Sequence, residues 1–201
     1  MEQAMTPSQM TEEQINKAVA NYRAMLVKHA PDFASSAVQQ VLGSKEFARD
    51  QLGLFRSRVE AISNLIARHV VVNRTRTPME AIEAAGRNKY LNDSVVATMP
   101  RGESGEADVI FFRLGRDVSD ANLDKEYDLR DLKPADPYAL AAVNEADPAF
   151  ADNHPNSTHW KDVDGNWCYA AFGRWYDERS VGVRRSGSGW RDDWWFAGLR
   201  K

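Results

Sequence analysis

The C-terminal part of the chain contains the stretch THWKDVDGNWCYAAFGRW, residues 158–175. At its centre is Asp164-Gly165, a pair that favours a two-residue hairpin turn because both turn positions need a positive φ. The segments on either side are rich in aromatic and β-branched residues, which is typical of strands. We therefore predict a hairpin with strands over 158–163 and 166–175, in which Trp160 lies opposite Tyr169.

In this register, alternation of the side chains gives the hairpin two distinct faces. One face holds Trp160, Trp167, Tyr169 and Trp175, and the other holds His159, Lys161, Val163, Cys168, Ala170 and Phe172. Further strands are predicted over 180–185 and 190–197, with a reversal at Ser186–Gly189, so that the four strands form an antiparallel meander. The apolar run Val109–Phe112 is expected to join this sheet as a strand covered on both faces.

The first half of the chain carries helix signals instead. Thr11 and Thr77 each open a capping-box sequence, with Gln14 and Glu80 three residues later, and both predict a helix start. A short helix is expected over 36–42. A long helix with a broad apolar stripe is expected over 44–69. Beyond residue 100, Ser119 and Asp136 are further N-cap candidates, ahead of helices from 120 to about 132 and from 137.

These patterns predict an α+β fold with a helical N-terminal half. Pro100, Gly102 and Gly105 indicate a linker. We therefore expect a helical domain over residues 1–100 and an α+β domain over 101–201, the latter built on the tryptophan-rich antiparallel sheet.

Composition narrows the class of protein. The 201 residues are 43% hydrophobic and 27% charged, with a net charge of −3, which is typical of a globular protein. A single cysteine, Cys168, cannot form an internal disulfide, and the first ten residues have no apolar signal core. No apolar run reaches the ~20 residues of a membrane span. A cytoplasmic protein of bacterial or phage type, without membrane association, is the expectation.

The tryptophans are the most informative feature, because all six lie between positions 160 and 195. Exposed together, they would form an apolar patch of the kind that marks a binding site. The candidate residues for binding a ligand or a partner protein are Trp160, Trp167, Tyr169, Trp175 and Trp194. The alternative is that the N-terminal helices cover this face and the rings belong to the core.

A second candidate surface is the basic segment in the middle of the chain. Residues 56–101 carry eight basic and four acidic side chains, whereas residues 102–201 carry thirteen basic and nineteen acidic ones. Arg74, Arg76, Arg87 and Lys89 surround the helix that starts at Thr77, whose free N–H groups favour an anion or a nucleic-acid backbone. The alternative is a solvated basic surface that pairs with the acidic C-terminal half.

Known catalytic and metal motifs do not fit. Asp162-x-Asp164-x-Asn166 opens like a calcium loop, but Trp167 and Gly173 stand where glycine and glutamate are needed. His154, His159 and Cys168 do not have the spacing of a zinc site. Nucleotide-binding glycine loops and a serine-nucleophile elbow are absent from the sequence. We therefore predict neither a metal nor a cofactor.

The functional hypotheses follow in order. The first is a non-enzymatic binding or adaptor protein that recognises a protein or a small ligand through the tryptophan-rich face. The second is a nucleic-acid-associated accessory protein that uses the basic segment around residues 74–89. An enzyme with an unrecognised carboxylate pair comes third. The helix over 44–69 is also a candidate for homo-oligomer formation.

Overall fold

The computed structural model describes residues 10–62, 64–103, 105–187 and 189–201, and for residues 57 and 60–62 it describes the backbone alone. The chain divides into two compact units, and the boundary between them lies between Ser63 and Asn64. We refer to residues 10–62 as the helical arm and to residues 64–201 as the globular unit. Each is described by itself.

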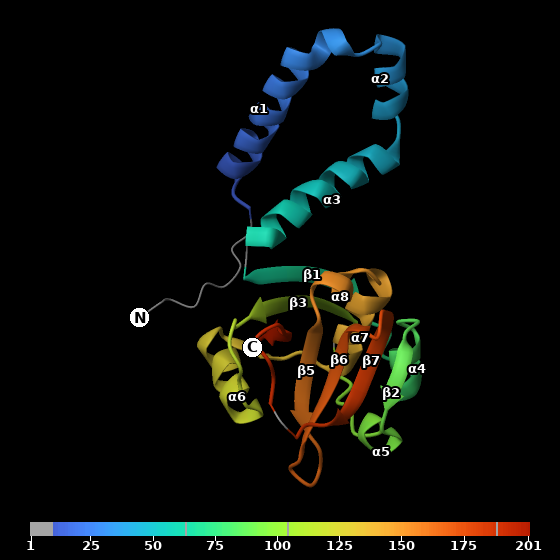
Figure 1. Ribbon diagram of the computed structural model, residues 1–201, viewed down its shortest axis with the longest axis vertical. Coiled ribbons are helices and arrows are strands. Elements are labelled where there is room, and N and C mark those ends of the chain that lie inside the picture. Colours follow the sequence, from blue (N-terminus) through green and yellow to red (C-terminus); the bar gives the residue numbers. More distant parts are fainter. Residues whose placement is uncertain (1–9, 63, 104, 188) are drawn as a thin grey trace. The chain divides into compact units, whose positions relative to one another are not determined.

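The helical arm contains α1 (Glu12–His29), a 3₁₀ turn (Ala30–Asp32), α2 (Ser35–Leu42) and α3 (Lys45–Ile62). The predicted capping box at Thr11 is confirmed, since its hydroxyl accepts a hydrogen bond from Gln14 N at 3.2 Å. Figure 1 shows α1 and α3 as separate helices, and Gln51 Nε2 of α3 donates a hydrogen bond to the hydroxyl of Tyr22 in α1. The expected long helix is too long at its C-terminal end, because it stops at Ile62.

Residues that we expected to extend that helix form an edge strand instead. β1 (Leu65–Val71) pairs antiparallel with β3 (Glu106–Arg113). Val70, Val71 and Val72 are β-branched and favour an extended backbone, and β3 supplies the hydrogen-bond partners that a strand needs. The predicted strand at Val109–Phe112 is confirmed within β3, and all four of its residues are buried.

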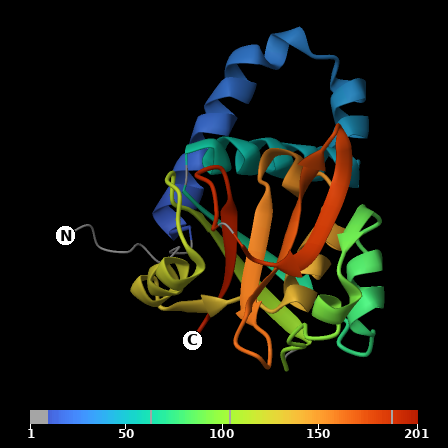
Figure 2. The ribbon, with the colours of Figure 1, turned by 60° about the horizontal axis from the view of Figure 1, so that its bottom comes forward.

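The sheet has eight strands and is mixed, so the predicted antiparallel meander is only partly right. The other strands are β2 (Asn88–Leu91), β4 (Leu132–Pro134), β5 (Asn156–Lys161), β6 (Trp167–Trp175), β7 (Glu178–Arg185) and β8 (Trp195–Arg200). The order is β1-β3-β8-β5-β6-β7-β2, with β4 beside β8. Only β5, β6 and β7 form a meander, and Figure 2 shows them side by side in orange and red.

The last strand, β8, is the main departure from the meander. It pairs antiparallel with β3 and parallel with β5, while the outer neighbour of β7 is β2, in parallel. The segment that follows β7 does not turn tightly back. Trp190 instead forms an isolated antiparallel bridge with Val118, and this contact directs the chain away from β7.

The hairpin register is one residue away from our prediction. Lys161 lies opposite Trp167, and Trp160 lies opposite Cys168 instead of Tyr169. The reason is Asp162, whose Oδ1 accepts hydrogen bonds from Asp164 N (3.1 Å) and Asn166 N (2.8 Å). These hydrogen bonds stabilise a loop over residues 162–166, which is longer than the predicted two-residue turn. Because alternation has period two, the slip moves Trp160 to the opposite face of the sheet from Trp167.

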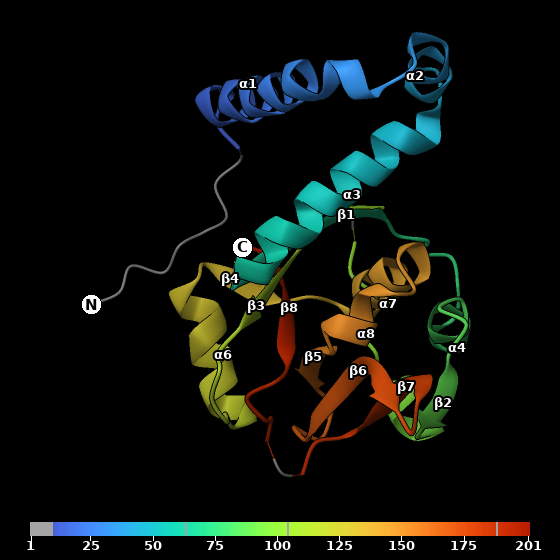
Figure 3. The ribbon, with the colours of Figure 1, turned by 45° about the horizontal axis from the view of Figure 1, so that its top comes forward.

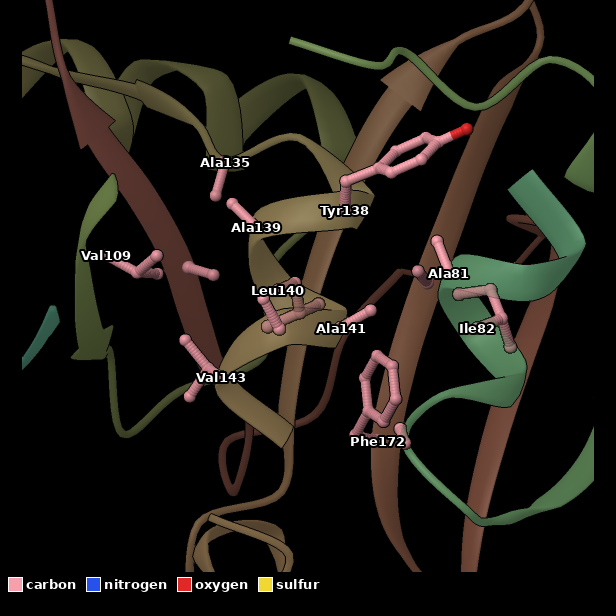
Figure 4. Packing of buried hydrophobic residues seen from close by; sticks show 14 of the residues in the cluster. Ala81, Ile82, Val109, Ala135, Tyr138, Ala139, Leu140, Ala141, Val143 and Phe172 are labelled. Carbon is pink, nitrogen blue, oxygen red and sulfur yellow. The ribbon is translucent and has the colours of Figure 1, made fainter. Parts of the chain in front are cut away.

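Helices cover both faces of the sheet. α4 (Pro78–Glu83), α5 (Asp93–Val96), α7 (Pro137–Ala146) and α8 (Phe150–Asn153) contribute to the larger core, and α6 (Asp120–Leu129) contributes to a smaller core on the other face. Figure 3 shows α6 and α7 on opposite sides of the strands. In Figure 4, Leu140 and Val143 of α7 lie between Val109 of β3 and Phe172 of β6.

The predicted domain boundary near residue 101 falls inside the globular unit. Residues 64–100 provide β1 and β2 at the two ends of the sheet order, and they also provide α4, which packs on α7. The predicted capping box at Thr77 is confirmed at the start of α4. None of the helices in the described part of the chain is long and apolar enough to cross a membrane.

Candidate functional site

A cleft of about 870 Å³ opens where two parallel strands separate. β5 and β8 are paired only at their first residues, Asn156 with Trp195 and Ser157 with Phe196. Beyond that point β8 pairs with β4, and the carboxyl ends of β5 and β8 diverge. Crevices at the carboxyl ends of diverging parallel strands are common ligand sites. We call this hollow the fork cleft.

The fork cleft combines indole rings with charged groups. β5 and β6 contribute His159, Trp160, Lys161 and Trp167 to its lining, β4 and β8 contribute Lys133, Leu199 and Arg200, and α6 contributes Asp124. Arg74, Asp136 and the acidic residues Glu103, Glu106 and Asp108 line it as well. Lys133, Lys161 and Arg200 are exposed, and among the described residues none of the three forms an ion pair with a carboxylate. The ammonium of Lys161 lies 4.5 Å from the centre of the Trp167 ring.

Trp167 and His159 are stacked at the mouth of the cleft. Their ring centres are 4.6 Å apart and their planes differ by 14°. Trp167 also lines a second hollow of about 900 Å³, together with Asp120, Ser186 and Trp190. The indole therefore stands between two depressions, with the imidazole of His159 against it.

His159 is the centre of a polar cluster, which we define as His159, Asp120, Asp124, Ser186 and Trp190. His159, Asp120 and Trp190 are buried, and Asp124 and Ser186 are half-buried. The imidazole is only 2% exposed, and its Nδ1 lies 3.0 Å from Asp120 Oδ1. Its Nε2 lies 3.0 Å from Asp124 Oδ1, but not in hydrogen-bond geometry. Both aspartates come from α6, four residues apart and hence on one side of the helix.

Asp120 is the most heavily hydrogen-bonded member of this cluster. Besides His159, it accepts bonds from Ser186 Oγ at 2.5 Å and from Trp190 Nε1 at 2.9 Å. Burial by itself raises the pKa of this carboxyl, but the three donors together outweigh burial and lower the pKa below its ordinary value. The cluster therefore holds a stable carboxylate that fixes the position of the imidazole.

The five residues of the predicted tryptophan site lie in different parts of the globular unit and do not form one surface. Trp160 is 8% exposed and faces the larger core, where its Nε1 donates to Thr98 Oγ1 at 3.1 Å. Tyr169 and Trp194 are half-buried and both pack on Trp190, with ring centres 5.5 and 5.6 Å away. Trp175, also half-buried, contacts Tyr90 at 5.8 Å. Of the five predicted residues, only Trp160 and Trp167 line the fork cleft.

The predicted anion site consists of residues that already have protein partners. Arg74 pairs with Asp136, and Arg76 pairs with Glu145 at 2.6 Å. Arg87 is buried and donates to Asn144 Oδ1 and to the carbonyl of Pro148 at 3.2 and 2.9 Å. Lys89 lies 2.5 Å from Glu83. Arg74 and Arg76 thus pair with acidic residues of the C-terminal half, whereas Arg87 has neutral partners and Lys89 pairs within the basic segment.

Sequence reasoning missed the members of the polar cluster, although one signal was present. Asp120 and Asp124 follow an N-cap serine at positions that share a helix face. With the predicted register, however, His159 was placed on the face of Cys168, away from Trp167. In the structure His159 and Cys168 lie on opposite faces of the sheet, because Cys168 is opposite Trp160.

Comparisons with protein-family models, with curated proteins and with solved structures gave no match. The site is therefore interpreted from its own geometry and chemistry.

Proposed function

We propose that this protein binds a small ligand in the fork cleft, and that the ligand carries a flat ring and an anionic group. The observation that supports this proposal most directly is the position of Trp167. Its indole lies at the mouth of a cleft between diverging parallel strands, beside the ammonium of Lys161. An aromatic ring next to a cation offers stacking and charge to the same ligand.

The anionic group is inferred from the basic side chains of the cleft. Lys133, Lys161 and Arg200 keep their charge without a carboxylate partner among the described residues, and they come from three different strands. Asp124, by contrast, lies against His159. Glu103, Glu106 and Asp108 also line the cleft, so a carboxylate or phosphate of the ligand would bind beside Lys133, Lys161 and Arg200.

The polar cluster would serve this site by positioning its aromatic residue. His159 stacks on Trp167, and Asp120 holds the imidazole from the other side. A ring that is fixed before the ligand arrives loses less conformational entropy on binding than a mobile one. The proposal is thus a non-enzymatic binding function in which the buried pair of His159 and Asp120 orients Trp167, a half-buried recognition residue.

The test is a binding screen with defined probes. Nucleoside monophosphates, sugar phosphates and aromatic carboxylates are titrated against the protein by tryptophan fluorescence and calorimetry, with the uncharged nucleosides and sugars as matched controls. We expect at least one anion to bind, and Trp167→Ala and Lys161→Ala each to weaken it by roughly tenfold. Trp175→Ala, which lies outside the cleft, is the matched control. The proposal fails if no probe binds, or if Trp175→Ala weakens binding as much as Trp167→Ala.

A further inference from the structure

The helical arm exposes its apolar side chains to solvent. No residue of α1 or α2 is buried, and the large apolar residues of α3 whose exposure is described are exposed or half-buried. The exposed set is Ile15, Val19, Tyr22, Met25, Leu26, Val27, Phe33, Val38, Val41, Leu42, Leu52, Leu54, Phe55 and Val59. Most of the stability of a helix in a protein comes from the packing of its apolar face, so the exposed apolar residues of the arm indicate a partner surface.

The spacing of these residues is that of a helix-pairing seam. On α1, Ile15, Val19, Tyr22 and Leu26 follow one another at steps of four, three and four. On α3, Ala48, Leu52, Phe55 and Val59 repeat the same steps. Alternating steps of three and four keep apolar residues on one line that faces a partner helix. Both long helices of the arm therefore present seams that fit other helices of the same kind.

The globular unit does not offer a surface that matches these seams. The large apolar side chains exposed among its described residues are Val71, Leu129, Val163 and Tyr176. They belong to four different segments, namely β1, the end of α6, the loop after β5 and the turn after β6. Single exposed residues of this kind do not form a docking patch. The surface that packs on the apolar seams of the arm therefore does not belong to the described part of the globular unit.

A second arm is the cover that the arm's own residues favour. Pairing α1 with α3 inside one arm would bury the two seams but leave apolar residues beside the seams exposed, among them Met25, Val27 and Leu54. Two arms together supply four seam-bearing helices, which is enough to enclose a common core. In a four-helix arrangement each helix has two neighbours, so apolar residues on the flanks of a seam are buried as well, which a single pair of helices cannot do.

Charge indicates the direction of this pairing. The first half of α1 carries Glu12, Glu13 and Lys17, a net charge of −1, and the second half carries Arg23 and Lys28, a net charge of +2. Side by side in parallel, two copies would place like charges together. An antiparallel pair places the acidic start of each α1 beside the basic end of the other. We infer that residues 10–62 are a dimerisation arm, through which two copies of this chain associate by an antiparallel helical bundle.

The experiment measures the mass of the full chain by light scattering and sedimentation over about 1 to 100 μM, a range chosen to bracket the Kd of small helical interfaces. We expect a dimer for the natural chain, and a monomer for Val19→Glu combined with Leu26→Glu. Val163→Glu, on an exposed loop of the globular unit, and Ala24→Glu, on the face of α1 opposite the seam, are the controls that remain dimeric. A monomeric natural chain at all concentrations would overturn the inference.

Variants with reversed charges provide a second test in case Val19→Glu combined with Leu26→Glu unfolds the helices of the arm. Glu12→Lys with Glu13→Lys is expected to raise the dimer Kd by about tenfold. Adding Arg23→Glu and Lys28→Glu to the same chain restores opposite charges in the antiparallel pair and should restore the Kd. If the fourfold variant is as weak as the double variant, antiparallel self-pairing is wrong. Circular dichroism of each variant reports whether the helices are retained.

Discussion

His159 Nδ1 lies 3.0 Å from Asp120 Oδ1 although the two residues are 39 positions apart in the chain. The side chain of His159 is fully buried and that of Asp120 is 9% exposed. A buried imidazole needs hydrogen-bond partners, and here α6 supplies the carboxylate from one face of the sheet. This pair joins α6 to β5 and sets the orientation of the ring on which Trp167 stacks.

Replacing Asp120 with Asn should destabilise the globular unit. The substitution removes a charged acceptor from His159, Ser186 and Trp190, and the expected loss is about 1–3 kcal/mol in the free energy of unfolding. Urea denaturation followed by tryptophan fluorescence measures it. Asp117→Asn, at an exposed position just before α6, is the matched control and should change stability by less than about 0.5 kcal/mol.

The same carboxylate gives stability a defined pH dependence. The pKa of Asp120 is lower in the folded chain than in the unfolded one, so the unfolded state binds the proton more readily. Its stabilising contribution is therefore complete above the unfolded pKa of about 4 and is lost as pH falls through the folded pKa. We measure the free energy of unfolding by denaturation at several pH values between about 2.5 and 6. As the pH is lowered, it should decrease less steeply for Asp120→Asn than for the natural chain. Equal slopes would contradict this account of the cluster.

Arg87 and Lys89 are predicted to differ strongly although both belong to the basic segment. Arg87→Met leaves Asn144 Oδ1 and the carbonyl of Pro148 without their buried donor, so we expect a loss of about 2–3 kcal/mol. Lys89→Met breaks only an exposed pair with Glu83 and should cost less than about 1 kcal/mol. Thermal unfolding of both variants makes the comparison. Equal effects would mean that Arg87 is not a structural residue.

Gly189 should not tolerate a side chain. Its φ is +74°, and a Cβ there would lie 2.7 Å from the carbonyl oxygen of Val118. Since the clash is with backbone, Gly189→Ala is expected to destabilise the fold by about 1–3 kcal/mol. Gly187→Ala is the control, because a Cβ at that position meets no atom within 4 Å. The melting temperature of Gly189→Ala should be clearly lower than that of Gly187→Ala, and equal values would contradict the prediction.

Cys168 is predicted to resist thiol reagents in the folded protein. The side chain is fully buried on the face of the larger core, and burial raises the pKa of its thiol. Labelling with an aromatic disulfide should therefore follow unfolding, not precede it. Val163→Cys, at a position that is 95% exposed, provides an internal standard and should react at once. Rapid labelling of Cys168 itself would contradict the observed register of β6.

Local signals in the sequence were sufficient for the helix starts and for one strand. Thr11, Thr77 and Asp136 form their predicted caps, because a cap is a hydrogen bond between residues two or three positions apart. Val109–Phe112 was recognised as a buried strand from its unbroken apolar run. The tryptophan cluster was also evident, but not the positions of its members.

The hairpin register was predicted wrongly because two local signals compete between residues 162 and 166. The Asp164-Gly165 turn was overridden by the side chain of Asp162, and the resulting slip of one residue exchanged the faces of Trp160 and His159.

What the sequence determined by itself was therefore the type and start of most elements, since these depend on neighbours within one or two turns. The tertiary structure alone decided that residues 65–71 pair as a strand, that β8 joins β3 and β5, and that His159 meets Asp120. The reason is physical: a strand's partner and a buried residue's partner are chosen by the packing of the whole sheet, and that information is not contained in any short stretch of chain.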